Sequence, residues 1–274
     1  MLQSIKNSFY FFIFSNLFVA FCALALFFSS EIILESKNYQ IGVFIFFSTI
    51  FTYNFQRIVR IKRGVKHVRR YWLEENKKAI AFLITISGLI SFYQLLFFNI
   101  STQITIIICG IISLLYPFGI RKIPFLKIFI ISIVWTTATF LLLVFENHIV
   151  MDFSILIHFF IRFFFVLAIT IPFDIRDLSF DAAELKTIPV LFGEANARLL
   201  AILFLILSQV MCIYLLVFQL LELNYFLALL TSFFITSILI LKSTSKKSEI
   251  YFSFGVESTS VIFYLILAIS SCMV

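Results

Sequence analysis

This sequence of 274 residues is poor in charge, glycine, proline, cysteine and histidine. Only 13% of its residues are charged, and it holds 7 glycine, 4 proline, 4 cysteine and 3 histidine residues. So little charge excludes an ordinary soluble domain. No Pro- or Gly-rich linker interrupts the chain, so we expect a single domain over residues 1–274. The cysteines lie in apolar runs without a CxxC or Cys/His pairing, which argues against a zinc site or a disulfide framework.

Apolar residues take the place of the missing charge. They make up 62% of the chain, and the mean hydropathy is +1.10. Each membrane-spanning helix needs about 20 mostly apolar residues, so the chain has room for many. We predict an all-α polytopic membrane protein with nine spans. The first run is too long for a removable signal and lacks a small-residue cleavage site. The predicted spans are Phe9–Ser29, Gln40–Ile58, Ala79–Phe98, Thr102–Phe118, Phe125–Phe145, Phe153–Phe173, Leu199–Leu221, Tyr225–Leu241 and Gly255–Met273.

Basic residues gather in alternate joints between these segments. With nine spans, 19 of the 21 Lys and Arg residues fall on one side, and Lys37 and Arg162 are the exceptions. The positive-inside rule then predicts a cytoplasmic N-terminus and an external C-terminus, in a protein of a bacterial inner membrane. The net charge of +7 is explained by this topology and by anionic lipid headgroups, so nucleic acid is not expected as a partner.

Three carboxylates follow the sixth predicted segment. Asp174, Asp177 and Asp181 are separated by three and then four residues, which places them on one face of a helix. Like charges so close repel one another, and a hard divalent cation such as Mg²⁺ relieves that repulsion. A solvated acidic helix start is the alternative, because carboxylates are favoured near helix N-termini. Spacing alone does not decide between them.

Two motifs carry a resemblance to a known family. The run Asp174–Asp181, followed by Lys186–Val190 and Gly193, resembles the second aspartate motif of the UbiA-type intramembrane prenyltransferases. The patch Leu115–Lys127, after the fourth segment, is similar to that family's Tyr/Pro/Arg/Lys signature. The resemblance implies nine helices around a central cavity. It also implies that Mg²⁺ ions, held by two aspartate motifs, bind the diphosphate of an isoprenoid donor whose carbocation attacks a lipophilic, often aromatic, acceptor.

The resemblance also implies roles for particular residues. Asp174, Asp177 and Asp181 would hold Mg²⁺, and Asp177 and Asp181 would be the catalytic pair. The basic residues near the two motifs would contact the diphosphate, and two further residues would line the substrate cavity. The diphosphate contacts are Arg121, Lys122, Lys127 and Lys186, and the cavity residues are Tyr116 and Arg162. Arg162 lies in mid-span, so packing between helices with a tyrosine or a carbonyl as its partner is the alternative to lining the cavity. Glu257 opens the last segment, where it either joins the polar cleft or lies at the membrane interface.

The first aspartate motif is incomplete in this sequence. Anchored on Asn54, the two aspartate positions of the family's NxxxDxxxD pattern hold Ile58 and Lys62, and no carboxylate occurs between Glu35 and Glu74. Asn54, Arg57 and Ile61 repeat the offsets of the three aspartates. We therefore count Asn54, Arg57 and Arg60 among the diphosphate contacts, because guanidinium groups bind phosphate without a metal.

Three functions agree with this pattern. The protein is a prenyltransferase with a reduced metal site, a catalytically silent member that binds isoprenoid lipid, or a transporter. Hydrogen bonds from Arg57 or Arg60 to Asp177 or Asp181 would favour the silent form. An open cleft that both arginines face would favour the enzyme. The acceptor, the length of the prenyl chain and the oligomeric state are not encoded in any pattern that we recognise.

Overall fold

The computed structural model describes residues 2–64, 69–118, 123, 125–178 and 186–272, and these residues are helical apart from short joints. Long apolar runs become helices in a membrane because only a helix or a closed barrel satisfies every backbone group there. The helices are α1 (Leu2–Phe14), α2 (Leu17–Ile33), α3 (Tyr39–Lys62), α4 (Arg70–Glu75), α5 (Lys77–Leu95), α6 (Ile100–Leu115), η1 (Tyr116–Phe118), α7 (Leu126–Thr136), η3 (Thr137–Leu141), α8 (Leu142–Glu146), α9 (Phe153–Arg176), α11 (Ile188–Val217), α12 (Leu223–Leu241), η4 (Tyr251–Val256) and α13 (Thr259–Ser271).

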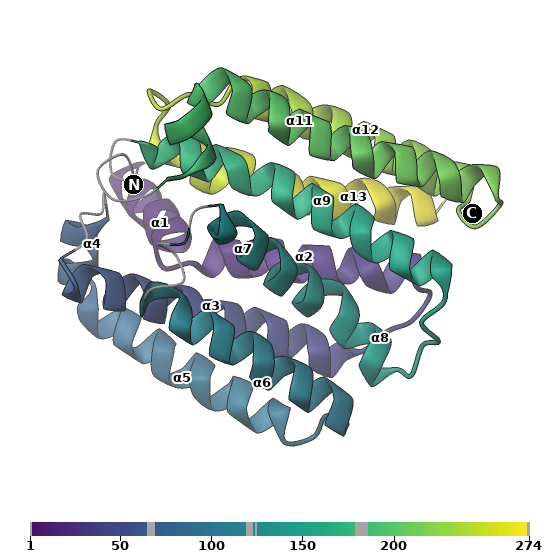
Figure 1. Ribbon diagram of the computed structural model, residues 1–274. Helices are drawn as coiled ribbons and strands as arrows, with labels where there is room; N and C mark the ends of the chain where they lie inside the picture. The colour runs from purple at the N-terminus through teal and green to yellow at the C-terminus, as the bar shows by residue number, and fades with distance from the viewer. Residues whose placement is uncertain (1, 65–68, 119–122, 124, 179–185, 273–274) are drawn as a thin grey trace.

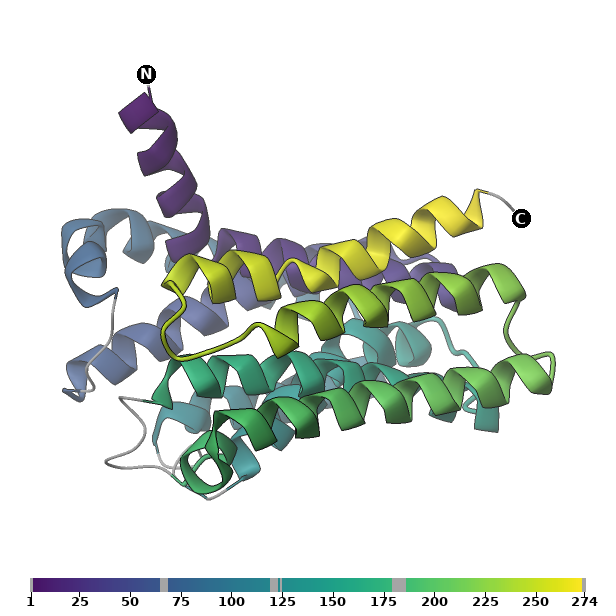
Figure 2. The same ribbon diagram turned by 90° about the horizontal axis from the view of Figure 1, so that it is seen from above.

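The long helices form a bundle that closes on itself (Figures 1 and 2). Helix α2 packs on α3 and α13, α9 packs on α7 and α11, and α12 packs on α11 and α13. Among the apolar spans of the described residues, helix α9 is the most enclosed, with 67% of its most apolar stretch buried. In the span that includes α6, 11% is buried. The start of α1 and the end of α13 lie at opposite ends of the bundle, and α4 lies at the end where α1 begins (Figure 1).

The number of spans is roughly consistent with the prediction of nine. In the described part of the chain, 7 helices are long and apolar enough to cross a membrane, and the bent pair α1 and α2 brings the number to 8. Helix α3 has 24 residues, which gives a length of about 36 Å, enough to cross the hydrocarbon core. Its polar second half lowers its hydropathy, and that half lines the cavity described below.

The first predicted segment, Phe9–Ser29, is not one straight helix. The chain bends by 61° between α1 and α2. Asn16 lies at the bend with a φ of 64°, and its side chain donates a hydrogen bond of 2.8 Å to Asn54 of α3. Asn54 in turn donates to the backbone carbonyl of Ser15 at 2.8 Å. A polar dipeptide inside the apolar run therefore breaks the helix, and a buried amide from α3 holds the break.

Two predicted boundaries also need correction. The seventh segment was expected from Leu199, but α11 begins at Ile188 and contains a kink at Gly193, where φ is 79°. That value favours glycine, because it lies in the left-handed region. The last span begins with the π-helical turn η4 at Tyr251, before the expected Gly255. The polar residues in both stretches hid the helix starts from a hydropathy count.

Arg162 connects helices in the middle of the bundle. Of the two roles predicted for it, lining the substrate cavity is wrong, because its guanidinium lies between helices. It donates hydrogen bonds of 2.6 Å to the Leu26 carbonyl and to the Ser29 hydroxyl, both on α2. It also lies 5.0 Å from the ring centre of Phe263 on α13. One buried side chain on α9 thus joins three helices where lipid offers no hydrogen bonds.

Substituting Arg162→Lys tests this role. Lysine keeps the charge but lacks the planar fork, so it loses at least one of the two charge-assisted bonds. We expect the free energy of unfolding to fall by about 1.5–3 kcal/mol. Thermal unfolding of the detergent-solubilised protein measures this change. The control is Arg70→Lys, because the Arg70–Glu74 pair is 58% exposed on both sides. Equal unfolding temperatures for the two variants would contradict the role of Arg162.

Candidate functional site

A cavity of about 210 Å³ opens between α3, α7 and α9. Charged side chains gather along the last turns of α3 and α9 and the first turn of α7. Branched apolar side chains of α7 and α9 line the cavity farther along these helices. The lining residues are Thr52, Tyr53, Gln56, Arg57, Arg60, Ser113, Tyr116, Lys127, Ile130, Ile131, Val134, Trp135, Val166, Ile169, Thr170, Phe173, Asp174, Arg176, Asp177 and Glu257.

An ion pair between α7 and α9 closes one wall of the cavity. The ammonium group of Lys127 lies 2.5 Å from a carboxylate oxygen of Asp174, and their side chains are 10% and 2% exposed. Asp174 follows Pro172 inside α9, and Lys127 is in the first turn of α7. Burial makes the pair obligatory, because either charge alone would be very costly in this setting. A predicted metal ligand is thus paired with a predicted diphosphate contact.

Asp177 is also paired with a cation. It ends α9, and it accepts hydrogen bonds of 2.8 and 3.2 Å from the guanidinium of the neighbouring Arg176. Burial raises the pKa of the Asp177 carboxyl, but Arg176 more than offsets this and holds the pKa below its usual range. Asp177 is therefore ionised at neutral pH. The bidentate arrangement occupies both of its oxygens.

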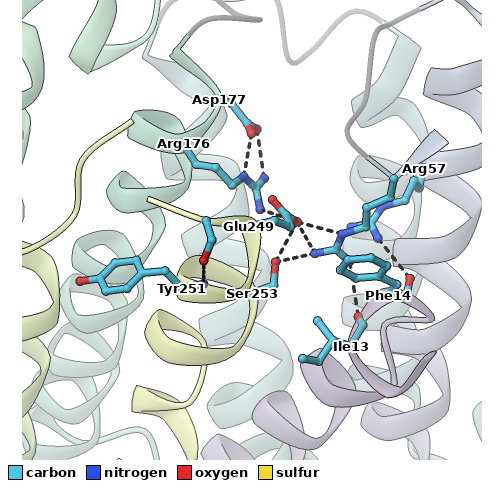
Figure 3. Close-up of polar contacts among 10 residues, drawn as sticks. Ile13, Phe14, Arg57, Arg176, Asp177, Glu249, Tyr251 and Ser253 are labelled. Atoms are coloured by element: carbon cyan, nitrogen blue, oxygen red, sulfur yellow. Dashed lines mark hydrogen bonds and ion pairs between the residues drawn. The ribbon is translucent and has the colours of Figure 1, made fainter. Parts of the chain in front are cut away.

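Glu249 joins Arg176 to Arg69. Its carboxylate accepts two hydrogen bonds from Arg69, of 2.8 and 2.5 Å, one of 2.8 Å from Ser253, and a longer one of 3.4 Å from Arg176. Arg69 is 3% exposed, and it also donates to the Ile13 carbonyl of α1. Figure 3 shows this network, which ties together α1, the residue before α4, the end of α9 and the start of the last span.

The sequence analysis missed this network. Arg69 and Arg176 were counted only as topology-setting charges, and Glu249 was not considered. Glu249 is an acidic residue in a joint that otherwise carries Lys242, Lys246 and Lys247. That contrast was the one available signal, and it did not identify the partners.

Arg57 faces the cavity from α3. The structure gives its guanidinium one hydrogen bond among the described residues, a long one of 3.4 Å to the Phe14 carbonyl (Figure 3). No described carboxylate lies within ion-pair distance of it. Arg60, one turn farther along α3, also lines the cavity, as does the buried Tyr116 predicted for this role. Arg57, Arg60 and Tyr116 thus line one cavity, and their roles toward a substrate stay predictions.

The inner wall carries polar groups that no motif marked. The indole of Trp135 on α7 donates a hydrogen bond of 2.9 Å to the Tyr53 hydroxyl on α3. Glu257 follows the π-helical turn η4 and also faces the cavity. Among the described residues, the Glu257 carboxylate has no hydrogen bond or ion pair. Turns of the π type are frequent at functional sites.

Other predicted site residues lie elsewhere. Asn54 does not face the cavity, because its amide is 1% exposed and bonded to Ser15, Asn16 and Ile50. Its prediction as a diphosphate contact is therefore wrong, as is that of Arg162 as a cavity residue. Lys186 precedes α11, is exposed and does not line this cavity. The predictions for Arg121, Lys122 and Asp181 lie outside the described residues.

Long apolar helices packed in a bundle around a charged cavity define the class as an integral membrane protein. The model of the UbiA prenyltransferase family matches residues 75–267, and the chain belongs to that family. No curated protein matches the sequence.

Solved structures share the fold. A UbiA homologue from Aeropyrum pernix K1 has a TM-score of 0.67 at 14% identity, over 93% of this chain and 98% of that one. A UbiA homologue from Archaeoglobus fulgidus bound to GPP and Mg²⁺ has a TM-score of 0.61 at 15% identity, over 93% and 96%. A digeranylgeranylglyceryl phosphate synthase structure gives 0.61 at 15% identity, over 93% and 94%.

The Glu249 network predicts a pH-dependent contribution to stability. Burial raises the pKa of Glu249, but Arg176 and Arg69 outweigh it and leave the pKa lowered. Such a group stabilises the fold above its unfolded pKa of about 4.3, and this stabilisation is lost as the pH falls through the folded pKa. We expect Glu249→Gln to lower the free energy of unfolding by about 1.5–3 kcal/mol at neutral pH. The gap to the wild type should shrink as the pH falls below about 4.

Thermal unfolding at a series of pH values measures that gap. Glu74→Gln is the control, because it removes a carboxylate from an exposed pair at the same end of the molecule. A gap that stays constant down to acid pH would show that Glu249 does not act through its charge.

Proposed function

We propose that this protein transfers a prenyl group from a prenyl diphosphate to a lipophilic acceptor within the membrane. The observation that carries the proposal is one cavity with cations at one end and apolar side chains beyond them. An isoprenoid diphosphate has the same division, with an anionic head and an apolar tail. Membership of the UbiA prenyltransferase family and solved homologues bound to GPP or DMAPP with Mg²⁺ support it.

Arg57, Arg60 and Lys127 are the groups that we assign to the diphosphate. They come from α3 and α7 and face one space, so they can contact the head from two sides. The tail would lie along Val134 and Ile169. In this assignment the basic mouth opens to the cytoplasm of a bacterial cell, as the distribution of Lys and Arg predicts.

The reaction needs one bond to break and one to form. The bond between the prenyl C1 and the diphosphate oxygen breaks, and its electron pair leaves with the diphosphate. Cations at the mouth stabilise the charge that develops there. The acceptor forms a new bond to C1 and loses a proton. Glu257 is our candidate base, because Asp174 and Asp177 each already have a cationic partner.

The Mg²⁺ predicted from the family resemblance does not fit the described residues. When bound in a site of this class, the ion balances diphosphate charge. Here Lys127 and Arg176 balance the carboxylates of Asp174 and Asp177, and the first motif offers no carboxylate. We therefore assign no step to the metal. These same pairs keep a silent, lipid-binding protein as the second candidate.

A transfer assay separates the two candidates. The purified protein in lipid nanodiscs is given labelled geranyl or geranylgeranyl diphosphate with a panel of phenolic and alcoholic lipid acceptors, with and without Mg²⁺. We expect a prenylated product with at least one acceptor. Binding of the donor without any product in either condition would favour the silent candidate.

Filling the tail chamber gives a matched pair of variants. Val134 lines the cavity, whereas the adjacent Ile133 is 39% exposed on the outside of α7. Val134→Trp should lower kcat/KM by about tenfold or more, the equivalent of about 1.4 kcal/mol of lost binding. Ile133→Trp should leave the rate near that of the wild type. Equal rates for the two variants would place the tail outside this cavity.

A further inference from the structure

Among the described residues, the wall of the cavity carries more positive than negative charge. Its cations are Arg57, Arg60, Lys127 and Arg176, and its carboxylates are Asp174, Asp177 and Glu257. A site that holds two divalent ions needs the opposite balance, because Mg²⁺ prefers oxygen ligands, with carboxylates among them. A divalent ion here would be placed among four cations at short range, where repulsion is strong.

The two described carboxylates of the aspartate motif, Asp174 and Asp177, already have cationic partners. Lys127 lies 2.5 Å from Asp174, and the Arg176 fork lies 2.8 Å from Asp177 at its shortest contact. A metal bound to these carboxylates would lie close to both cations, which repel it, and displacing either cation would leave a buried group without its counter-charge. Within the described ranges, no three His, Cys, Asp or Glu side chains gather as a metal site.

Arg57 lies where its guanidinium can balance the charge of a bound diphosphate, as a metal ion would. Its guanidinium has five N–H donors, and the described residues engage it through one bond of 3.4 Å. It enters the cavity from α3, across from the carboxylates of α9. A guanidinium binds phosphate through two parallel bonds, and its charge is delocalised, so it is desolvated more easily than an ammonium group. Arg57 therefore offers an anion both charge and directed donors.

We propose that the cavity binds the diphosphate of its substrate through side-chain cations, with Arg57 as the principal contact, and that this binding does not require a divalent metal. Lys127 and Arg176 keep the carboxylates of α9 from repelling the incoming anion. Arg60 and Lys127 complete the contacts at the mouth. This inference rests on the proposed function for the class of ligand, a prenyl diphosphate, and it changes how that ligand is held.

The direct test is binding with and without metal. The non-reactive thiolo analogue of geranyl diphosphate is titrated by calorimetry into the full-length protein in nanodiscs, in excess EDTA and in excess Mg²⁺. We expect the two Kd values to differ by less than about threefold, which is below the effect of losing one buried charge contact. Binding that disappears in EDTA and returns with Mg²⁺ would overturn the inference.

Variants of α3 locate the contact. Arg57→Gln should weaken binding of the analogue in EDTA by about 30-fold or more, since truncating one partner of a buried charge pair costs at least about 2 kcal/mol. Lys62→Gln is the matched control, because it removes one charge from the exposed end of the same helix. Arg57→Lys keeps the charge without the fork and should fall between Arg57→Gln and the wild type. Equal affinity for Arg57→Gln and Lys62→Gln would contradict the assignment.

The outcomes separate this inference from the proposed function. Binding only with Mg²⁺, together with transfer, overturns the inference and leaves the function intact. Binding in EDTA without transfer to any acceptor supports the inference and contradicts the function. Binding in neither condition contradicts both. The EDTA comparison uses the wild-type protein, so it holds even if an Arg57 variant fails to fold.

Discussion

The buried ion pair between Lys127 and Asp174 is the contact on which the site depends. It joins the start of α7 to the end of α9, so it fixes the distance between two of the helices that enclose the cavity. Its two charges neutralise each other in surroundings where neither is stable alone. The pair also decides what Asp174 can do, because a carboxylate held by an ammonium group is a poor ligand for a second cation. The Lys127–Asp174 pair therefore determines both how α7 packs on α9 and what Asp174 can bind.

The same rule of local neutralisation extends around the mouth. Arg176 satisfies Asp177 and reaches Glu249, and Glu249 binds Arg69, whose side chain also contacts α1. Every carboxylate of this outer network has an arginine partner. Arg57 differs, because its one described hydrogen bond is long and ends on a carbonyl. The network thus ties the end of α9 to the start of the last span at η4, whereas Arg57 presents a cation to the cavity from α3.

Much of the fold could be predicted because one physical quantity, apolar run length, determines a membrane helix. The bend at Ser15 and Asn16 was not predictable in that way, since two polar residues in a long run change the average hydropathy little. Its cause is a contact with Asn54, far along the chain. Arg162 shows the same limit. A charge in mid-span predicts a partner inside the bundle, but nothing in the pattern marks a backbone carbonyl of α2 as that partner.

For the site, the aspartate spacing and the basic patch brought Asp174, Asp177, Lys127 and Arg57 to one cavity. The pairing among them was not encoded in spacing, because it depends on which helices touch. The sequence left Glu257 open between the polar cleft and the membrane interface, and the turn η4 places it in the wall of the cavity. Residue type thus predicted where charge gathers, and tertiary packing decided which charge remains for a ligand.

The most direct measurement is a structure of the protein with the thiolo analogue of geranyl diphosphate, prepared with Mn²⁺ and collected for anomalous scattering. Our account predicts the diphosphate within hydrogen-bond distance of Arg57, the tail along Val134 and Ile169, and no anomalous peak beside Asp174 or Asp177. An anomalous peak that bridges those aspartates and the diphosphate would contradict it.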